Sequence, residues 1–325
     1  AEASTAAAGL LAPQLESDAP GPFLELCLLS RMAWPKWVAE LQQLSGVDCG
    51  YLPNGLLQVA FTDDEMAALD AKQSWQGAHS LRGELLNPVE LRQREPAITS
   101  KALGALFLPD DHQVDPRKLL PALAVAATKA GVQFKTGMVR ALTGASVDLD
   151  GETLKADRVI LAAGAWSGLV NGADVDPARV KPMRGQIVEL QLRAPIVTAT
   201  LKSATGYVVP RADGRIIAGS TMELVGFDKN VTAAGVRTVL DAAIQLVPAL
   251  EKAAVIQSWA GLRPWTDDQL PFIGEGNSPG LLLATGHFRN GILLAPITAR
   301  LLGQLVRGER PTVDLKPFRY TRSRA

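Results

Sequence analysis

The segment most suggestive of chemistry is residues 286–291 (GHFRNG), in which two glycines enclose a histidine and an arginine. The apolar run 280–286 precedes it and the run 291–308 follows, a pattern typical of a buried strand, a tight turn and a helix. Such a turn directs backbone N–H groups and the positive end of the helix dipole at one point. Arg289 adds a permanent charge there. The segment predicts a site for an electron-rich group, although an ordinary strand-to-helix connection has the same pattern.

A second candidate is Arg263, which lies in the largely apolar stretch 259–264 (WAGLRP). A buried arginine needs a partner, and the natural one is a planar carboxylate held by two parallel hydrogen bonds. We therefore expect Arg263 to bind the acid group of a ligand. The competing interpretation is an ion pair with one of the chain's own 33 Asp and Glu residues.

Other kinds of catalytic site find little support. The three histidines stand far apart, and residues 110–115 (DDHQVD) are as well explained by a solvated loop and a helix cap, so no metal is predicted. Ser167 lacks the Gly-x-Ser-x-Gly spacing of a hydrolase nucleophile. Residues 274–280 (GEGNSPG) precede a strand instead of following one, which predicts a turn and not a dinucleotide fingerprint.

The composition narrows the class of protein. The chain has 325 residues, for which the prior is about two domains. Its 33 basic residues balance its 33 acidic ones, which argues against a nucleic acid or an anionic membrane as partner. The apolar stretches are too short to span a membrane. Two cysteines, Cys27 and Cys49, provide no disulfide framework, so we expect a cytoplasmic protein with reduced thiols.

The elements that must position these residues fall into two kinds. Asp115 predicts the N-cap of a helix that Gly131 ends, and the apolar runs 132–135 and 157–164 after it are typical of buried parallel strands. Residues 206–221 predict a β-hairpin around the turn 211–213. Together with the extended stretches 55–61 and 180–192, they predict a mostly antiparallel sheet interleaved in sequence with an α/β layer.

The chain opens with small residues, AEASTAAAG over positions 1–9, and without methionine. Such density of alanine and glycine marks either a close approach of backbone to another group or a disordered end.

Four segments together resemble the glycine oxidases of thiamine biosynthesis, within the D-amino-acid oxidase group of FAD enzymes. They are residues 286–296 (GHFRNGILLAP), 259–264 (WAGLRP), 219–228 (GSTMELVGFD) and 4–9 (STAAAG). The resemblance covers almost the whole chain. It implies an α/β FAD-binding domain of Rossmann type at residues 1–49, 108–182 and 266–325, and an interleaved antiparallel-sheet substrate domain at 50–107 and 183–265.

One departure from this family is large. Its members begin with a strand, a Gly-x-Gly-x-x-Gly turn and a helix that hold the FAD pyrophosphate. This chain starts after that point, so we expect a fragment whose amino-terminal unit is absent.

The resemblance also implies roles for individual residues. Arg263 and Tyr207 would bind the substrate carboxylate, with Arg289 close by, while Thr205 stands where some relatives have histidine. Val139 would contact the adenine end of FAD. The remaining cofactor-binding residues implied are Ser4, Thr5, Ala8, Gly9 and Leu10 at the pyrophosphate and ring, Ala163 and Gly164 under the nucleotide, and Gly286, His287, Phe288, Arg289, Asn290, Gly291, Ile292 and Leu293 at the flavin pyrimidine edge.

The implied reaction is FAD-dependent oxidation of glycine, or another small amine-bearing acid, to the imine, with dioxygen as acceptor and hydrogen peroxide as product. The alternatives are an oxidase or dehydrogenase acting on sarcosine or D-amino acids and, from another class, an inactive fragment that serves as a binding module. The partners expected are the small amino acid and dioxygen, with a homo-oligomer as a further possibility.

Overall fold

The computed structural model describes residues 2–322, and its largest element is an eight-stranded sheet. The strand order is β14-β10-β13-β12-β11-β2-β4-β3, in which only β11 and β2 are parallel neighbours. The predicted mostly antiparallel sheet is confirmed, and the predicted hairpin forms β12 and β13. The strands are β2 (Leu56–Ala60), β3 (Glu84–Leu86), β4 (Gly104–Leu108), β10 (Lys181–Gln191), β11 (Thr200–Lys202), β12 (Tyr207–Pro210), β13 (Arg215–Gly219) and β14 (Ala254–Trp265).

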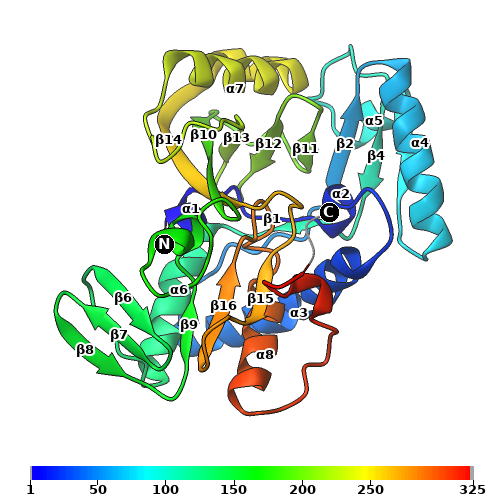
Figure 1. Cartoon of the computed structure of the whole chain (residues 1–325). Helices are drawn as coiled ribbons and strands as arrows, with labels where there is room; N and C mark the ends of the chain where they lie inside the picture. Colours follow the sequence, from blue (N-terminus) through cyan, green and yellow to red (C-terminus); the bar gives the residue numbers. More distant parts are fainter. Residues whose placement is uncertain (1, 323–325) are drawn as a thin grey trace.

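Helices cover one face and one end of this sheet (Figure 1). Helix α7 (Ala233–Leu246) lies over β10, β13 and β12, and its Val239 and Leu246 share a core with Val188 and Val208 of the sheet. Helices α4 (Asp63–Ala78) and α5 (Pro88–Arg94) pack beside β2, β3 and β4. The face away from α7 is therefore available to other segments, which matters for the site.

A second, smaller layer lies below the large sheet in Figure 1. It contains β9 (Val159–Leu161), β15 (Phe272–Glu275) and β16 (Leu281–Thr285), in the order β15-β16-β9, with β16 and β9 parallel. Three helices pack against this layer and one another through a core that includes Trp34, Leu119 and Leu301. They are α3 (Pro22–Ser45), α6 (Pro116–Lys129) and α8 (Ala295–Val306).

The remaining elements are short. Helices α1 (Glu2–Ala6) and α2 (Pro13–Glu16) flank β1 (Leu10–Leu11), which pairs with β5 (His112–Gln113). A separate antiparallel sheet comprises β6 (Val139–Thr143), β7 (Ser146–Leu149) and β8 (Glu152–Lys155). Turns of 3-10 helix occur at Gly164–Leu169, Pro248–Lys252 and Lys316–Phe318.

The α/β layer differs from the sequence prediction in two strands. Helix α6 begins as predicted, because the Asp115 side chain accepts a hydrogen bond from the Arg117 N–H at 3.0 Å. Residues 132–135, however, form no strand, and Phe134 is 66% exposed. Strand β9 has only three residues, and its Ile160 is 46% exposed instead of buried on both faces. An apolar run indicates a strand only where a neighbouring strand supplies hydrogen bonds and cover, and β9 pairs with β16 alone.

None of the helices in residues 2–322 has the length and apolar character needed to cross a membrane.

The two cysteines of the chain are part of its core. Cys27 and Cys49 are buried free thiols, and burial raises the pKa of both, that of Cys49 to about 11. Both side chains therefore stay protonated and act as small apolar groups in the core.

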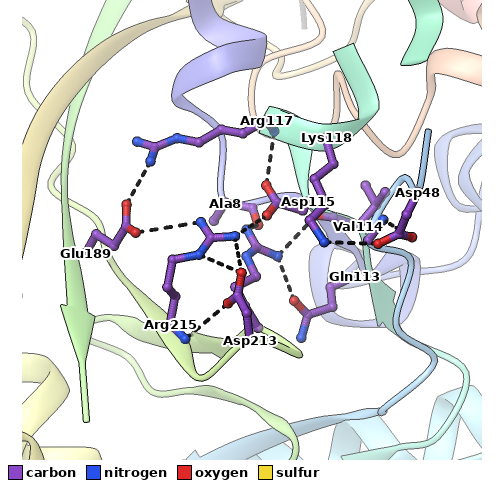
Figure 2. Close-up of polar contacts among 12 residues, drawn as sticks. Ala8, Asp48, Gln113, Val114, Asp115, Arg117, Lys118, Glu189, Asp213 and Arg215 are labelled. Carbon is purple, nitrogen blue, oxygen red and sulfur yellow. Dashed lines mark hydrogen bonds and ion pairs between the residues drawn. The ribbon is translucent and has the colours of Figure 1, made fainter. Parts of the chain in front are cut away.

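A network of ion pairs joins the start of α6 to the large sheet (Figure 2). Arg215 pairs with Asp115 at 2.8 Å and with Glu189 at 3.6 Å, and Glu189 also pairs with Arg117 at 2.7 Å. The carboxylates of Asp115 and Glu189 are almost completely buried. Because a buried carboxylate is costly unless it is paired, these contacts fix how the two layers meet.

The same region holds the beginning of the chain in place. The buried guanidinium of Arg211 donates to the carbonyl oxygen of Ala8 at 2.6 Å and to the Gln113 side chain at 2.7 Å. Burial lowers the pKa of Arg211 to about 10, so the side chain remains charged at neutral pH. Residues 6–10 are thereby fixed against the sheet.

We predict that Arg215→Met destabilises the protein, because it leaves two buried carboxylates short of a partner. The expected loss is about 3 kcal/mol in the free energy of unfolding, measured by chemical denaturation. Lys135→Met is the control, since Lys135 pairs with Glu152 at an exposed site and its loss should cost less than about 1 kcal/mol. Equal effects of the two substitutions would contradict the role assigned to the network.

Candidate functional site

A cavity of about 1090 Å³ lies between the large sheet and the smaller layer. Four parts of the chain line it: residues 2–16, residues 160–166, strands of the large sheet, and the loop between β16 and α8 together with α8. Pockets for small molecules usually hold ~300–1,000 Å³, so this one has room for a large ligand and a smaller one. We take it as the candidate functional site.

The loop between β16 and α8 is held by bonds to other elements. The carbonyl oxygen of Leu293 accepts hydrogen bonds from Ser30 Oγ at 2.6 Å and from Trp34 Nε1 at 2.9 Å, both on α3. Within residues 2–322, the N–H groups of Gly291 and Ile292 have no acceptor, and both residues line the cavity. Since they stand just before the positive end of α8, an electron-rich group is favoured next to them.

His287 belongs to the same loop and is uncharged at neutral pH. Burial lowers its pKa to about 4. Its Nε2 lies 3.1 Å from Oγ1 of Thr298 on α8, which fixes the ring. The positive potential of the loop therefore comes from its N–H groups, the helix dipole and Arg289, and not from this imidazole.

The small residues at the start of the chain pass very close to the sheet. A Cβ on Gly261 would lie 2.4 Å from the Cβ of Ala6, and Trp259 Nε1 donates to the Ala6 carbonyl at 3.1 Å. Gly9 has a φ of +81°, and a Cβ there would lie 2.0 Å from the Val114 carbonyl oxygen. The interpretation of this segment as a place of close approach is confirmed, and a disordered end is wrong for residues 2–9.

Arg263 and Tyr207 converge on the sheet face that borders the cavity. Arg263, on β14, lies across Gly185 of β10, where a Cβ would stand 2.1 Å from the guanidinium. Tyr207, on β12, lies across Gly219 of β13, where a Cβ would stand 2.4 Å from the hydroxyl. Because β10 and β13 are neighbours, glycines at these two positions allow the two side chains to approach each other.

The guanidinium of Arg263 has only neutral acceptors. It donates to Ser220 Oγ at 2.5 Å and to the Thr221 carbonyl at 3.3 Å, and it makes no ion pair within the described part of the chain. Burial lowers its pKa. The described residues therefore do not support the alternative interpretation, in which Arg263 forms an ion pair with an Asp or Glu of the same chain. A desolvated cation of this kind is stabilised by an anion, and a carboxylate matches its geometry.

Two further charged residues line the cavity. Glu16, at the end of α2, pairs with Arg289 at 2.8 Å. Lys202, at the end of β11, points into the same space, and burial lowers its pKa. Sequence patterns gave no signal for either residue, because an isolated acid or lysine at the end of an element is ordinary.

Most of the predicted site residues meet in this one cavity. Those in its wall are Ser4, Ala8, Gly9, Leu10, Ala163, Gly164, Tyr207, Arg263, His287, Phe288, Arg289, Asn290, Gly291 and Ile292. Thr5, Val139, Gly286 and Leu293 do not line it. Leu293 is completely buried in the core behind the loop, and Val139 is a partly exposed residue at the start of β6. Besides Glu16 and Lys202, the sequence interpretation missed Trp166 and Ser220 in the wall.

The cavity thus combines two binding features. The loop before α8 suits a flat ring that takes up negative charge, and the close-packed residues 3–9 leave space for such a ring to approach the backbone. Arg263 and Tyr207 suit a carboxylate beside it. Among residues 2–322, no group of three or more His, Cys, Asp or Glu side chains is arranged to hold a metal ion.

Comparison with known proteins gives one consistent family. The family described as DAO, FAD dependent oxidoreductase, matches residues 1–305. The bifunctional protein ThiO/ThiG of Synechocystis sp. is 39% identical over 97% of this chain, which spans 47% of that protein. The glycine oxidase of Geobacillus kaustophilus is 36% identical over 98% of this chain and 87% of its own length.

The fold agrees with the same relatives. The crystal structure of glycine oxidase from Geobacillus kaustophilus superposes with a TM-score of 0.96 at 34% identity, covering 100% of this chain and 90% of that one. The chain spans about half the length of the bifunctional relative. These matches run across the whole of this chain, and they give no support to the expectation of an absent amino-terminal unit.

We predict that Gly261→Val removes the ability to retain a flavin while the protein stays folded. The added side chain would push Ala6 and its neighbours into the cavity. The expected result is a dissociation constant for FAD at least about tenfold higher, equivalent to about 1.4 kcal/mol or more, and lower flavin absorbance per protein after purification. Gly77→Ala is the matched control, since nothing lies within 4 Å of a Cβ at that position. Full flavin content in Gly261→Val would contradict the close approach.

We predict that His287 makes the stability depend on pH below neutrality. Its pKa is about 4 in the folded protein against 6.5 ordinarily, so the unfolded chain binds the proton more tightly. The neutral ring contributes fully to the free energy of unfolding above pH 6.5. This contribution, up to about 3 kcal/mol, is lost as the pH falls toward 4. The measurement compares free energies of unfolding of wild type and His287→Gln across this range. An identical pH dependence of the two proteins would refute the assignment.

Proposed function

Because this chain belongs to the DAO family of FAD-dependent oxidoreductases, we propose that it oxidises the α-carbon of glycine, or of another small amino acid. The substrate loses a hydride from carbon and a proton from nitrogen to become an imine. Water hydrolyses the imine to glyoxylate and ammonia, and dioxygen is reduced to hydrogen peroxide. The observation that carries the proposal is that Arg263, which has no acid partner among residues 2–322, borders the same cavity as the loop before α8.

The residues present fit FAD at its flavin end. Residues 3–9 and 287–292 would hold the ring, since they offer small side chains, free N–H groups and the positive end of α8. Bound FAD supplies the acceptor for the hydride. The positive end of α8 and the free N–H groups before it would stabilise the negative charge that the transfer brings into the cavity.

Arg263 and Tyr207 would bind and orient the substrate. The guanidinium provides two parallel N–H donors for the carboxylate. Burial raises the pKa of Tyr207, so its hydroxyl stays protonated and donates a hydrogen bond to the same group. Two contacts on one carboxylate fix the direction in which the α-carbon points, and this orientation is the main contribution that these residues make to the rate. No protein base is required when the amine binds uncharged.

We also propose the division into two domains that the family resemblance implies. Residues 1–49, 108–182 and 266–325 would form the FAD-binding part, and residues 50–107 and 183–265 the substrate-binding part. The positions of the strands support this division, since six of the eight strands of the large sheet fall entirely in the second set, and β4 and β10 extend beyond it by only one and two residues. We further propose, as the family resemblance implies, that the product serves in making the thiazole of thiamine; the similarity to a protein named bifunctional ThiO/ThiG is in line with this proposal.

The test of the function is a hydrogen peroxide assay on FAD-loaded protein with glycine, sarcosine and D-alanine. We expect peroxide from at least one of the three, with glycine among the substrates. Reduction of a quinone without peroxide would indicate a dehydrogenase instead. A protein that binds FAD and oxidises none of them would remove the proposal and favour a binding role.

We predict that Arg263→Met weakens substrate binding by about 2–5 kcal/mol, because the carboxylate loses its charged partner. The expected result is a Michaelis constant for glycine at least about thirtyfold higher, with flavin content unchanged. Arg319→Met is the control, since Arg319 does not line the cavity. An unchanged Michaelis constant in Arg263→Met would overturn the assignment of the carboxylate site.

A further inference from the structure

Lys202 lies on the same sheet face as the residues assigned to the substrate carboxylate. In the antiparallel pair of β11 and β12, Lys202 stands directly opposite Tyr207. Side chains of directly opposed residues share one face of a sheet. The guanidinium of Arg263 reaches the end of β13 at Ser220, so Tyr207 stands between the two cations. All three side chains border one cavity.

A count of charges in the cavity wall leaves two cations without an acid. Arg289 pairs with Glu16 at 2.8 Å, Arg307 pairs with Glu309 at 2.6 Å, and Glu2 pairs with Lys229 at 2.7 Å. The remaining charged residues of the wall are Arg263 and Lys202. Within residues 2–322, Lys202 makes no ion pair, and its ammonium donates to the carbonyl oxygen of the adjacent Ser203.

Glycine would form an ion pair with only one of these two cations. Its single carboxylate would pair with Arg263 and leave the ammonium of Lys202 without an anionic partner in the cavity wall. Arg263 starts on β14, and its guanidinium crosses Gly185 to reach Ser220 at the end of β13, whereas Lys202 starts on β11. Strands β13 and β11 are two strand spacings apart, ~9.5 Å at the backbone. A ligand that pairs with both cations therefore needs two anionic groups.

We propose that Lys202 is a specificity-determining residue that binds the second anionic group of the substrate. The favoured substrates are then amino acids with an additional carboxylate, attached either to the amine or to the side chain. This inference rests on the proposed function, because it takes Arg263 as the site of the first carboxylate.

The energetic reason is the desolvation of Lys202. Burial lowers its pKa, which shows that the charged ammonium is disfavoured by its surroundings. The nearby carboxylate of Glu16 opposes this effect, but its ion pair is with Arg289. A ligand anion that reaches Lys202 replaces the lost hydration, whereas a ligand with a neutral group there leaves the ammonium unpaired.

The test uses two matched pairs of ligands. N-carboxymethylglycine and N-methylglycine differ in the second carboxylate and serve as substrates for steady-state kinetics. Succinate and butyrate have the same carbon chain and differ in one carboxylate, and they serve as non-reacting ligands in titration calorimetry. The proteins are the FAD-loaded wild type, Lys202→Met, Lys202→Arg and the control Lys181→Met, in which an exposed lysine paired with Asp267 is removed.

We expect wild type to bind succinate at least about tenfold more tightly than butyrate and to show the same order of Michaelis constants for the two substrates. Lys202→Met should lose this preference, so that its Michaelis constants for the two substrates become about equal. Lys202→Arg should keep most of the preference, and Lys181→Met all of it.

Equal binding of succinate and butyrate by wild type would overturn the inference, and it would do so even if Lys202→Met failed to fold. A loss of turnover in Lys202→Met with both substrates, at an unchanged preference, would also overturn it and would assign the lysine to the flavin reaction. If wild type oxidises none of the substrates but binds succinate preferentially, the proposed function fails while the anion subsite stands.

Discussion

The site is organised by one constraint: the guanidinium of Arg263 is enclosed beside the cavity and forms no ion pair with a carboxylate of residues 2–322. Arg263 reaches this place because Gly185 leaves its path across the sheet open, and Ser220 and Thr221 supply only neutral acceptors. A cation in such surroundings is stabilised most by an anion that arrives from outside. The unpaired guanidinium therefore favours the binding of a carboxylate ligand, and in our proposal it determines where the substrate binds.

The second half of the site comes from the smaller layer, which explains why two layers are needed. Ser30 and Trp34 of α3 hold the Leu293 carbonyl, so the N–H groups before α8 keep their direction without a ligand. The ion pairs around Arg215 fix α6 against the large sheet. Such prior arrangement means that little structure has to be ordered when ligands bind, and the binding energy remains available for orientation.

Much of the fold followed from local sequence patterns, and much of the site followed from motifs. The cap at Asp115, the hairpin of β12 and β13 and the turn before α8 each depend on residues next to one another in the chain. Val132–Lys135 failed as a strand because pairing depends on distant neighbours that no local pattern reveals. Glu16 and Lys202 were missed for the same reason, since only the folded chain brings them beside Arg289 and Tyr207.

The most direct test of the account is the visible absorbance of the FAD-loaded protein, recorded without oxygen before and after adding glycine. The account predicts that glycine bleaches the oxidised flavin spectrum, that air restores it, and that Arg263→Met needs far more glycine for the same bleaching. A fully loaded wild type whose spectrum stays unchanged with glycine, sarcosine and D-alanine would contradict the claim that this cavity brings an amino acid to the flavin.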